Sequence, residues 1–178
     1  MFHPLPKLPD GRPPVVMHGQ GFKPGVHDGI DLVYIKHPGE PVDLPTTGTY
    51  YCFPVGIPVM SMAGGIVEYA KWAANGWRVK VRHSDGRYQS HYLHLASISV
   101  ITGQVVEAGT PLGLAGYDPT KQTGDPRTNN IRHLHLGVFL DGEYVDPAPL
   151  LGYPSSLQSG GGLALLVGIG LILWRLAK

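Results

Sequence analysis

Glycine and proline interrupt this chain so often that long regular elements are disfavoured. The 178 residues include 25 Gly and 17 Pro, which recur without a fixed period. This pattern excludes a collagen-like repeat and favours short strands joined by many tight turns. The length suits one domain with its own core, plus an appendage. The sequence therefore predicts a mainly β fold, built of antiparallel sheets of short strands with long loops around a cleft.

Alternation of apolar and polar residues locates individual strands. In residues 77–83, Trp, Val and His alternate with Arg and Lys, which is typical of a strand with one polar face. Residues 84–86 read Ser-Asp-Gly and predict a turn, so residues 87–95 would be the returning strand of a hairpin. Further strands are expected at 65–71, 111–115, 134–140 and 143–145.

The two ends of the chain differ from its middle. Residues 1–14 are rich in proline and lack an apolar run, so we expect an extended lead-in and no ordinary secretory signal. Residues 15–150 would form the domain, with polar loops at 36–48 and 117–130. After a linker at 151–159, residues 160–178 are predicted to form a C-terminal hydrophobic helix. Its apolar run is short for a bilayer span, but its final Trp, Arg and Lys suit a membrane interface. We expect this tail to contact a lipid membrane, with burial against the domain or in an oligomer as the alternative.

Charge and cysteine content exclude several classes. Fourteen Lys and Arg stand against 13 Asp and Glu without forming a basic patch, so no nucleic-acid partner is expected. The single cysteine, Cys52, excludes an intramolecular disulfide and a cysteine-rich zinc site, and is expected to be buried. Any metal must therefore be bound by imidazole and carboxylate, and nine histidines are available.

Two short motifs offer ligands for a metal. Residues i and i+2 of a strand share a face, so His133 and His135 would lie side by side while Leu134 enters the core. His27 and Asp31 are four residues apart and can reach one ion in either extended or helical conformation. Each motif alone is as readily explained by polar residues on the wet face of a strand.

A third motif, Tyr92-Leu93-His94-Leu95, adds another histidine. Alternation would put Tyr92 and His94 on one face and the leucines on the other. Together the motifs supply two imidazoles and a carboxylate, which suits a catalytic zinc site with an open fourth position. The chain has no His-Glu-x-x-His helix, so His94 and His133 are left for proton transfer and oxyanion stabilisation.

In this order the motifs resemble the lysostaphin- and LytM-type zinc endopeptidases of bacterial cell walls. The resemblance covers about residues 15–150. It implies that His27, Asp31 and His135 bind one Zn²⁺ per chain, and that His94 and His133 are catalytic. The matching stretches are His27-Asp28-Gly29-Ile30-Asp31, Gly56-Ile57-Pro58-Val59, Ala63-Gly64-Gly65-Ile66-Val67, Tyr92-Leu93-His94-Leu95, Gly103-Gln104-Val105-Val106, His133-Leu134-His135-Leu136 and Val145-Asp146-Pro147.

The resemblance also implies a function. The chain is expected to be a zinc-dependent murein hydrolase that cuts peptide bonds in the stem or cross-bridge peptides of peptidoglycan. All five functional positions carry matching residues, which argues against the alternative of a non-catalytic wall-binding or structural membrane protein on the same fold. The segment between Asp31 and Gly56 is longer than the family usually carries, and is expected to reshape substrate access.

The absence of a signal, combined with the apolar tail, predicts where the enzyme would act. We expect a bacteriophage lysin, anchored by its C-terminal tail in the virion or its membrane and acting on the host periplasm or cell wall. A tail-anchored hydrolase of the bacterial cell envelope is the alternative.

Overall fold

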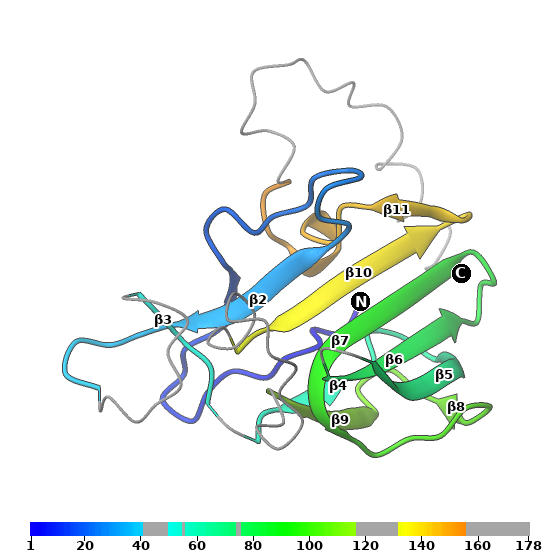
Figure 1. The fold of residues 1–178 in the computed structure, drawn as a ribbon, viewed down its shortest axis with the longest axis horizontal. Helices are drawn as coiled ribbons and strands as arrows, with labels where there is room; N and C mark the ends of the chain where they lie inside the picture. The colour runs from blue at the N-terminus through cyan, green and yellow to red at the C-terminus, as the bar shows by residue number, and fades with distance from the viewer. Residues whose placement is uncertain (41–49, 55, 74–75, 117–131, 156–178) are drawn as a thin grey trace, which may run out of the picture.

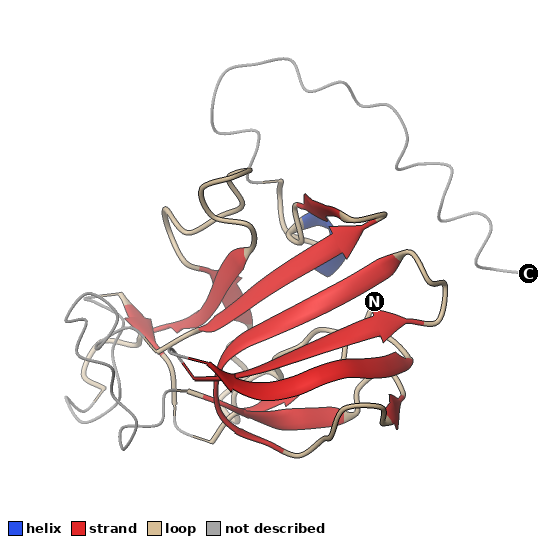
Figure 2. Cartoon of the chain, turned by 45° about the vertical axis from the view of Figure 1, so that its right-hand side comes forward, coloured by secondary structure: helices blue, strands red, loops and turns tan. Residues whose placement is uncertain are grey.

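Antiparallel strands are the main regular elements of the computed structural model, which describes residues 1–40, 50–54, 56–73, 76–116 and 132–155. In these residues the only helix is a 3-10 turn at Pro149–Leu151. Figure 2 shows this short turn beside the many strands. The strands are β1 (Pro14–Val16), β2 (Ile30–Ile35), β3 (Tyr51–Cys52), β4 (Pro58–Met60), β5 (Gly65–Ala73), β6 (Gly76–His83), β7 (Tyr88–Ile98), β8 (Val105–Val106), β9 (Pro111–Ala115), β10 (Leu134–Leu140) and β11 (Glu143–Val145).

The main sheet runs in the order β1-β2-β10-β7-β6-β5-β8 (Figure 1). Its central strand, β7, is long enough to pair twice. Its first part pairs with β6 and β10, whereas Leu95, Ser97 and Ile98 pair with β9, which in turn pairs with β4. The starts of β2 and β10, which are distant in sequence, pair directly with each other.

The core follows from alternation along these strands. Val79 and Val81 of β6 are fully buried, while the intervening Lys80 keeps part of its side chain in solvent. Leu134 and Leu136 of β10 are also fully buried, as the sequence predicts. Since residues i and i+1 of a strand point to opposite faces, burying these leucines turns the residues between them away from the core.

The predicted strands are confirmed over most of their length. The expected strands at 111–115, 134–140 and 143–145 coincide with β9, β10 and β11, and the hairpin is formed by β6 and β7. Cys52 is buried and free, as expected. The predicted loop at 117–130 and most of the one at 36–48 lie outside the described residues.

The predicted extended lead-in packs onto the domain. Leu5 and Leu8 are 2% and 6% exposed and belong to the core. Two backbone hydrogen bonds attach the segment, from the Phe2 N–H to the Met62 carbonyl and from the Met60 N–H to the Pro4 carbonyl.

The expected membrane localisation is wrong on the structure described. A span needs about 20 apolar helical residues, and none of the described segments forms a helix long and apolar enough to cross a membrane. The predicted C-terminal hydrophobic helix at 160–178, on which the expected anchor depended, lies outside the described residues and gains no support.

Candidate metal centre

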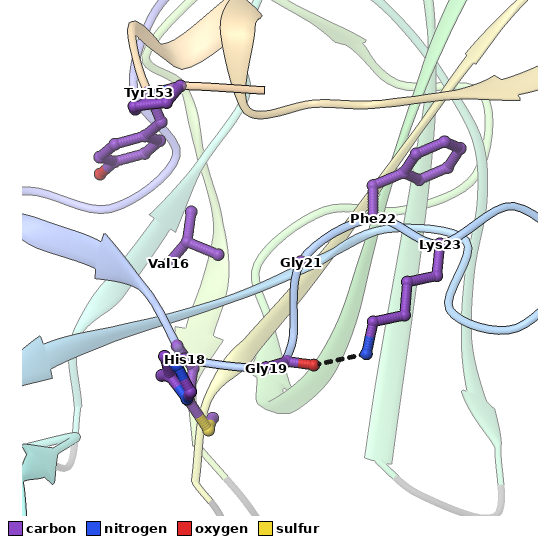
Figure 3. A pocket seen from close by; sticks show the side chains of 9 residues that line it. Val16, His18, Gly19, Gly21, Phe22, Lys23 and Tyr153 are labelled. Carbon is purple, nitrogen blue, oxygen red and sulfur yellow. Dashed lines mark hydrogen bonds between the residues drawn. The ribbon is translucent and has the colours of Figure 1, made fainter. Parts of the chain in front are cut away.

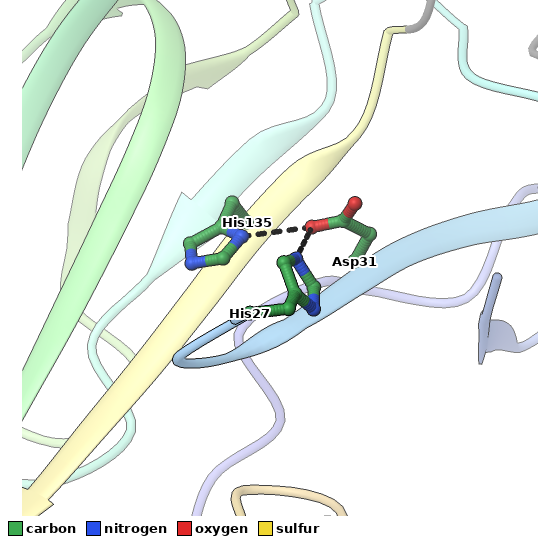
Figure 4. Close-up of side chains that lie close together, drawn as sticks. All are labelled: His27, Asp31 and His135. Carbon is green, nitrogen blue, oxygen red and sulfur yellow. Dashed lines mark hydrogen bonds and ion pairs between the residues drawn. The ribbon is translucent and has the colours of Figure 1, made fainter. Parts of the chain in front are cut away.

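Strand pairing brings the two halves of the candidate site together. Asp31 of β2 and His135 of β10 are direct cross-strand partners. His27 precedes β2 in a tight turn, in which its N–H donates to the Lys23 carbonyl at 2.8 Å. The turn folds the His27 ring back over the start of the strand, so that all three side chains meet at one point (Figure 4).

The three candidate ligands fit one metal ion. His135 Nδ1 lies 2.8 Å from Asp31 Oδ1, and His27 Nε2 lies 3.2 Å from the same oxygen. One ligand atom from each residue falls within 4.8 Å of the others. Neighbouring ligands of a tetrahedral zinc with bonds of about 2.0–2.1 Å are about 3.3 Å apart. The donor set and its spacing therefore suit zinc with a fourth position open.

A hydrogen bond on its far side orients His27. Its Nδ1 donates to the Gly21 carbonyl at 3.0 Å. Ligating histidines are commonly held this way, because a bond at one ring nitrogen fixes the tautomer and directs the other nitrogen to the metal. Here Nε2 is the nitrogen directed toward Asp31.

Electrostatics keeps the carboxylate ionised. Burial of Asp31, whose side chain is 8% exposed, tends to raise its pKa. Hydrogen bonds from His135 and His27 outweigh that effect and hold the pKa well below its ordinary value. In return, the hydrogen bond to Asp31 raises the pKa of His27. The site therefore presents a negative charge, which a divalent cation can neutralise.

Gly29 is required by close packing beneath the site. A Cβ atom at this position would lie 2.6 Å from His135 Nε2 and 2.6 Å from the Leu136 carbonyl oxygen. Only glycine permits this approach, because it lacks a Cβ atom.

Replacing Gly29 with alanine is expected to displace the His135 ring and weaken metal binding by about 10–100-fold, as when a supporting group is lost. Titration with zinc would measure this. Gly64→Ala is the matched control, since the atom nearest to its Cβ would be the end of the Glu107 side chain, at 3.3 Å, and the nearest backbone atom, the Val106 carbonyl oxygen, would be 3.6 Å away. Equal zinc affinity in the two variants would contradict the packing argument.

The two remaining candidate histidines lie beside the ligands. The rings of His94 and His133 are 4.7 Å apart, and those of His94 and His135 are 6.0 Å apart. His133 Nε2 is 3.5 Å from Asp31 Oδ2. All five residues singled out from the sequence thus gather in one place.

His94 reaches the site through an unusual backbone conformation. Its φ is 64°, in the left-handed region that costs an L-residue about 1–2 kcal/mol. The pairing of β6 with β7 also shifts register beside it, between Trp77 and Val79. Strain and bulges of this kind cluster at functional sites.

This conformation corrects the expected alternation. Tyr92 does not share a face with His94: it is fully buried in the core, where its hydroxyl accepts a hydrogen bond from the Met62 N–H at 2.8 Å. Leu95 is also fully buried. Tyr92 and Leu95 are an odd number of residues apart, so the left-handed residue between them breaks the two-residue period.

His91 lies in an aromatic cluster that sequence reasoning did not identify. Its ring stands 4.7 Å from Phe139, 6.1 Å from Tyr144 and 6.3 Å from Tyr69. Its Nε2 is buried and has no hydrogen-bond partner among the described atoms. Burial, followed by the charge of Lys80, lowers the pKa of His91 to about 4.

Acid is therefore expected to destabilise the fold through His91. The folded pKa is below the unfolded value of 6.5, so the unfolded chain binds the proton more readily. The contribution of neutral His91 to the free energy of unfolding is fully present above about pH 6.5. It is lost as the pH drops toward 4, by roughly 3 kcal/mol in total. His91→Phe keeps the ring contacts and removes the titration. Urea unfolding at pH 7 and pH 4.5 should show a smaller loss in this variant, and equal losses would exclude His91 as the source.

A pocket of about 580 Å³ lies beside the loop that leads to His27 (Figure 3). Its lining includes His18, Phe22 and Lys23 from that loop, with Tyr153 and Pro154 from the end of the described chain. Lys23 Nζ donates to the Gly19 carbonyl at 2.9 Å. None of the five candidate histidine and aspartate residues lines it, so it adjoins the candidate centre without containing it.

A second acidic group does not resemble a metal site. Asp10, His37 and Glu40 offer ligand atoms close together. Arg12 already occupies the space between the carboxylates, with Nε donating to Asp10 at 2.8 Å and Nη1 to Glu40 at 3.0 Å. A guanidinium supplies the positive charge that a cation would bring.

Comparison with known proteins assigns the family. The sequence model described as Peptidase family M23 matches residues 44–147, more than half of the chain. The chain belongs to peptidase family M23. The matched region includes His94, His133 and His135, whereas His27 and Asp31 precede it. Strand pairing, as described above, places Asp31 beside the matched part, and the His27 side chain contacts Asp31.

Individual relatives are consistent with this assignment. The peptidoglycan DD-endopeptidase ShyB of Vibrio cholerae is 33% identical over 112 residues, which are 62% of this chain and 24% of the relative. The catalytic domain of lysostaphin from Staphylococcus simulans is 23% identical, with a TM-score of 0.53 over 80% of this chain and 94% of that one. A zinc-containing peptidase from Vibrio cholerae is 24% identical, with a TM-score of 0.51 over 82% of this chain and 38% of that one.

These likenesses have defined limits. At these identities, the two structural comparisons establish the fold alone. The chain spans about a quarter of the length of the curated relatives it matches. The predicted phage origin and virion location gain no support from them.

Proposed function

We propose that this M23 chain is a zinc-dependent endopeptidase that hydrolyses peptide bonds in bacterial peptidoglycan. In this proposal residues 15–150 form the peptidase domain. His27, Asp31 and His135 hold one zinc ion, and His94 and His133 act on the substrate.

The observation that carries the proposal is the convergence of five side chains from three separate segments. His27 and Asp31 come from the turn before β2 and from its start, His94 comes from β7, and His133 and His135 come from the residue before β10 and from its start. The contacts between them run through both oxygens of Asp31 and through the His94 ring. A wall-binding protein has no need for a buried carboxylate surrounded by imidazoles, whereas a metallopeptidase does.

The roles of the residues follow from their positions. When bound, zinc would supply the Lewis acidity that polarises a carbonyl group and makes water nucleophilic near neutral pH. The Gly21 carbonyl and Asp31 hold the rings of His27 and His135 in place. Of His94 and His133, one takes the proton from the attacking water and the other donates a hydrogen bond to the developing oxyanion.

The substrate assignment draws on the curated relatives. ShyB and two further Vibrio cholerae relatives, ShyA and ShyC, are named peptidoglycan DD-endopeptidases and are 32–35% identical over the aligned residues. The candidate ligands of this chain are of the type expected for the same chemistry.

The test combines metal analysis with substrate digestion. The purified chain is expected to contain zinc in a one-to-one ratio and to release peptide fragments from purified peptidoglycan, as identified by mass spectrometry. Chelation should stop the release, and added zinc should restore it. Stoichiometric zinc without any cleavage of peptidoglycan would refute the proposed substrate, and the absence of zinc would refute the proposed centre.

A further inference from the structure

Strands β5 and β6 carry an excess of basic residues. Their sequences contain four, namely Lys71, Arg78, Lys80 and Arg82, and a single acid, Glu68. Glu68 is shared between two of them, at 3.1 Å from Lys80 Nζ and 3.0 Å from Arg82 Nε. The two strands therefore contribute three more basic than acidic side chains.

This basic face is continuous with the face that bears the candidate metal centre. Lys80 is the register partner of His91, and His91 is the register partner of Gly137. A Cβ atom at Gly137 would lie 3.7 Å from the His91 Cβ, so both face the same way. Gly137 and His135 are two residues apart on β10 and share that face. Lys80 thus lies on the same side of the sheet as His135.

Two of the basic residues lie in line with the centre. His135 pairs with Leu93 on β7, Arg78 lies on the next strand opposite this part of β7, and Lys71 pairs with Arg78 on β5. With strands about 4.8 Å apart, Arg78 lies about 10 Å and Lys71 about 14 Å from β10. An extended peptide advances about 3.3 Å per residue, so these cations are about three to four residues from a peptide bond at the centre.

Aromatic rings support this row of cations. Lys71 Nζ lies 4.6 Å from the centre of the Tyr69 ring, and Lys80 Nζ lies 5.5 Å from that of Phe139. Tyr69 and Phe139 both pack against His91. Lys71 and Lys80 are thereby held against packed aromatic rings, which reduces the side-chain entropy that is lost when a ligand binds.

We propose that Arg78 and Lys71 bind free carboxylate groups of peptidoglycan stem peptides, and that they make the enzyme prefer anionic peptides over amidated or neutral ones. The inference rests on the proposed function and specifies its substrate class. A guanidinium can bind a carboxylate through two parallel hydrogen bonds, and such charge-assisted bonds are stronger than neutral ones. A peptide without carboxylates offers no such bonds to this face.

The experiment compares two forms of one substrate. Cross-linked peptidoglycan fragments with free carboxyl groups are digested beside the same fragments after their carboxyl groups have been converted to carboxamides, using the zinc-loaded full chain. We expect a KM about tenfold lower for the carboxylate form, as one charge-assisted hydrogen bond would produce. The double variant Arg78→Gln with Lys71→Gln should lose this difference while keeping kcat, because only binding is affected.

A single variant and a control variant test whether the lost preference comes from Arg78 and Lys71. Lys71→Gln alone changes an exposed residue and should lose part of the preference even if the double variant folds poorly. Arg87→Gln removes a cation that pairs with Asp141 at the other end of β10, and should keep the full preference.

The outcomes separate the two proposals. Cleavage of both substrate forms with equal KM would overturn the carboxylate preference and leave the proposed function intact. Cleavage of neither form would overturn the proposed function itself. An undiminished preference in both Lys71→Gln and a folded double variant would exclude these residues as its source.

Discussion

Replacing His135 with alanine is expected to abolish zinc binding and peptidoglycan hydrolysis together. His135 Nδ1, at 2.8 Å from Asp31 Oδ1, is one of three donors, and only His27 and Asp31 would remain. Losing a group that merely supports a ligand costs about 10–100-fold in affinity or activity, so losing the ligand itself should exceed that range. Metal analysis after gel filtration should find almost no zinc, and digestion of peptidoglycan should release almost no fragments.

The control for this variant is His18→Ala. His18 is exposed, and its hydrogen bond to the Tyr51 hydroxyl comes from its backbone, which the substitution keeps. The control should therefore retain both zinc and activity. Full zinc occupancy in His135→Ala would remove this residue from the ligand set.

Replacing His94 with glycine is expected to stop turnover without the usual loss of stability. His94 would supply either the proton acceptor or the oxyanion donor, and a group in such a role contributes about 10²–10⁴-fold. Its left-handed φ of 64° costs about 1–2 kcal/mol, which glycine does not incur. The greater freedom of glycine in the unfolded chain offsets about 0.5–1 kcal/mol of that gain. His94→Gly should therefore bind zinc, unfold in urea no earlier than His94→Ala, and hydrolyse almost nothing.

Asp141→Gly is the matched control for this result. Asp141 also has a left-handed φ, of 52°, in the turn between β10 and β11. It lies six residues beyond His135, about 20 Å along the strand, so relief of strain there should leave turnover unchanged. If His94→Gly kept most of its turnover, His94 would have no catalytic role.

Several features of the fold were predictable because they depend on local pattern. Alternation in β6 and β10 located these strands and their buried residues, since a strand buries every second side chain wherever one face meets a core. The same alternation predicted that His133 and His135 lie on one face of their strand, side by side.

The environment of His94 was not predictable from the same pattern. Strict alternation placed Tyr92 beside it, whereas the structure buries Tyr92 and turns His94 out through a left-handed backbone. A single residue with positive φ changes the phase of every later residue in the strand. The conformation occurs where Gly76 of β6 closely approaches the backbone of His94, and the residue type at position 94 gives no sign of it.

By itself, the sequence determined the class of fold, because that depends on residue types and short spacings. Through its resemblance to a known family, it also predicted the candidate ligands and the candidate catalytic residues. Only the tertiary structure decided that β2 and β10 are adjacent, and hence that Asp31 stands opposite His135. It also decided that the basic residues of β5 and β6 lie on the same face of the sheet as His135. Pairing between strands about 100 residues apart is set by how the whole sheet buries its apolar side, and no short stretch of sequence contains that information.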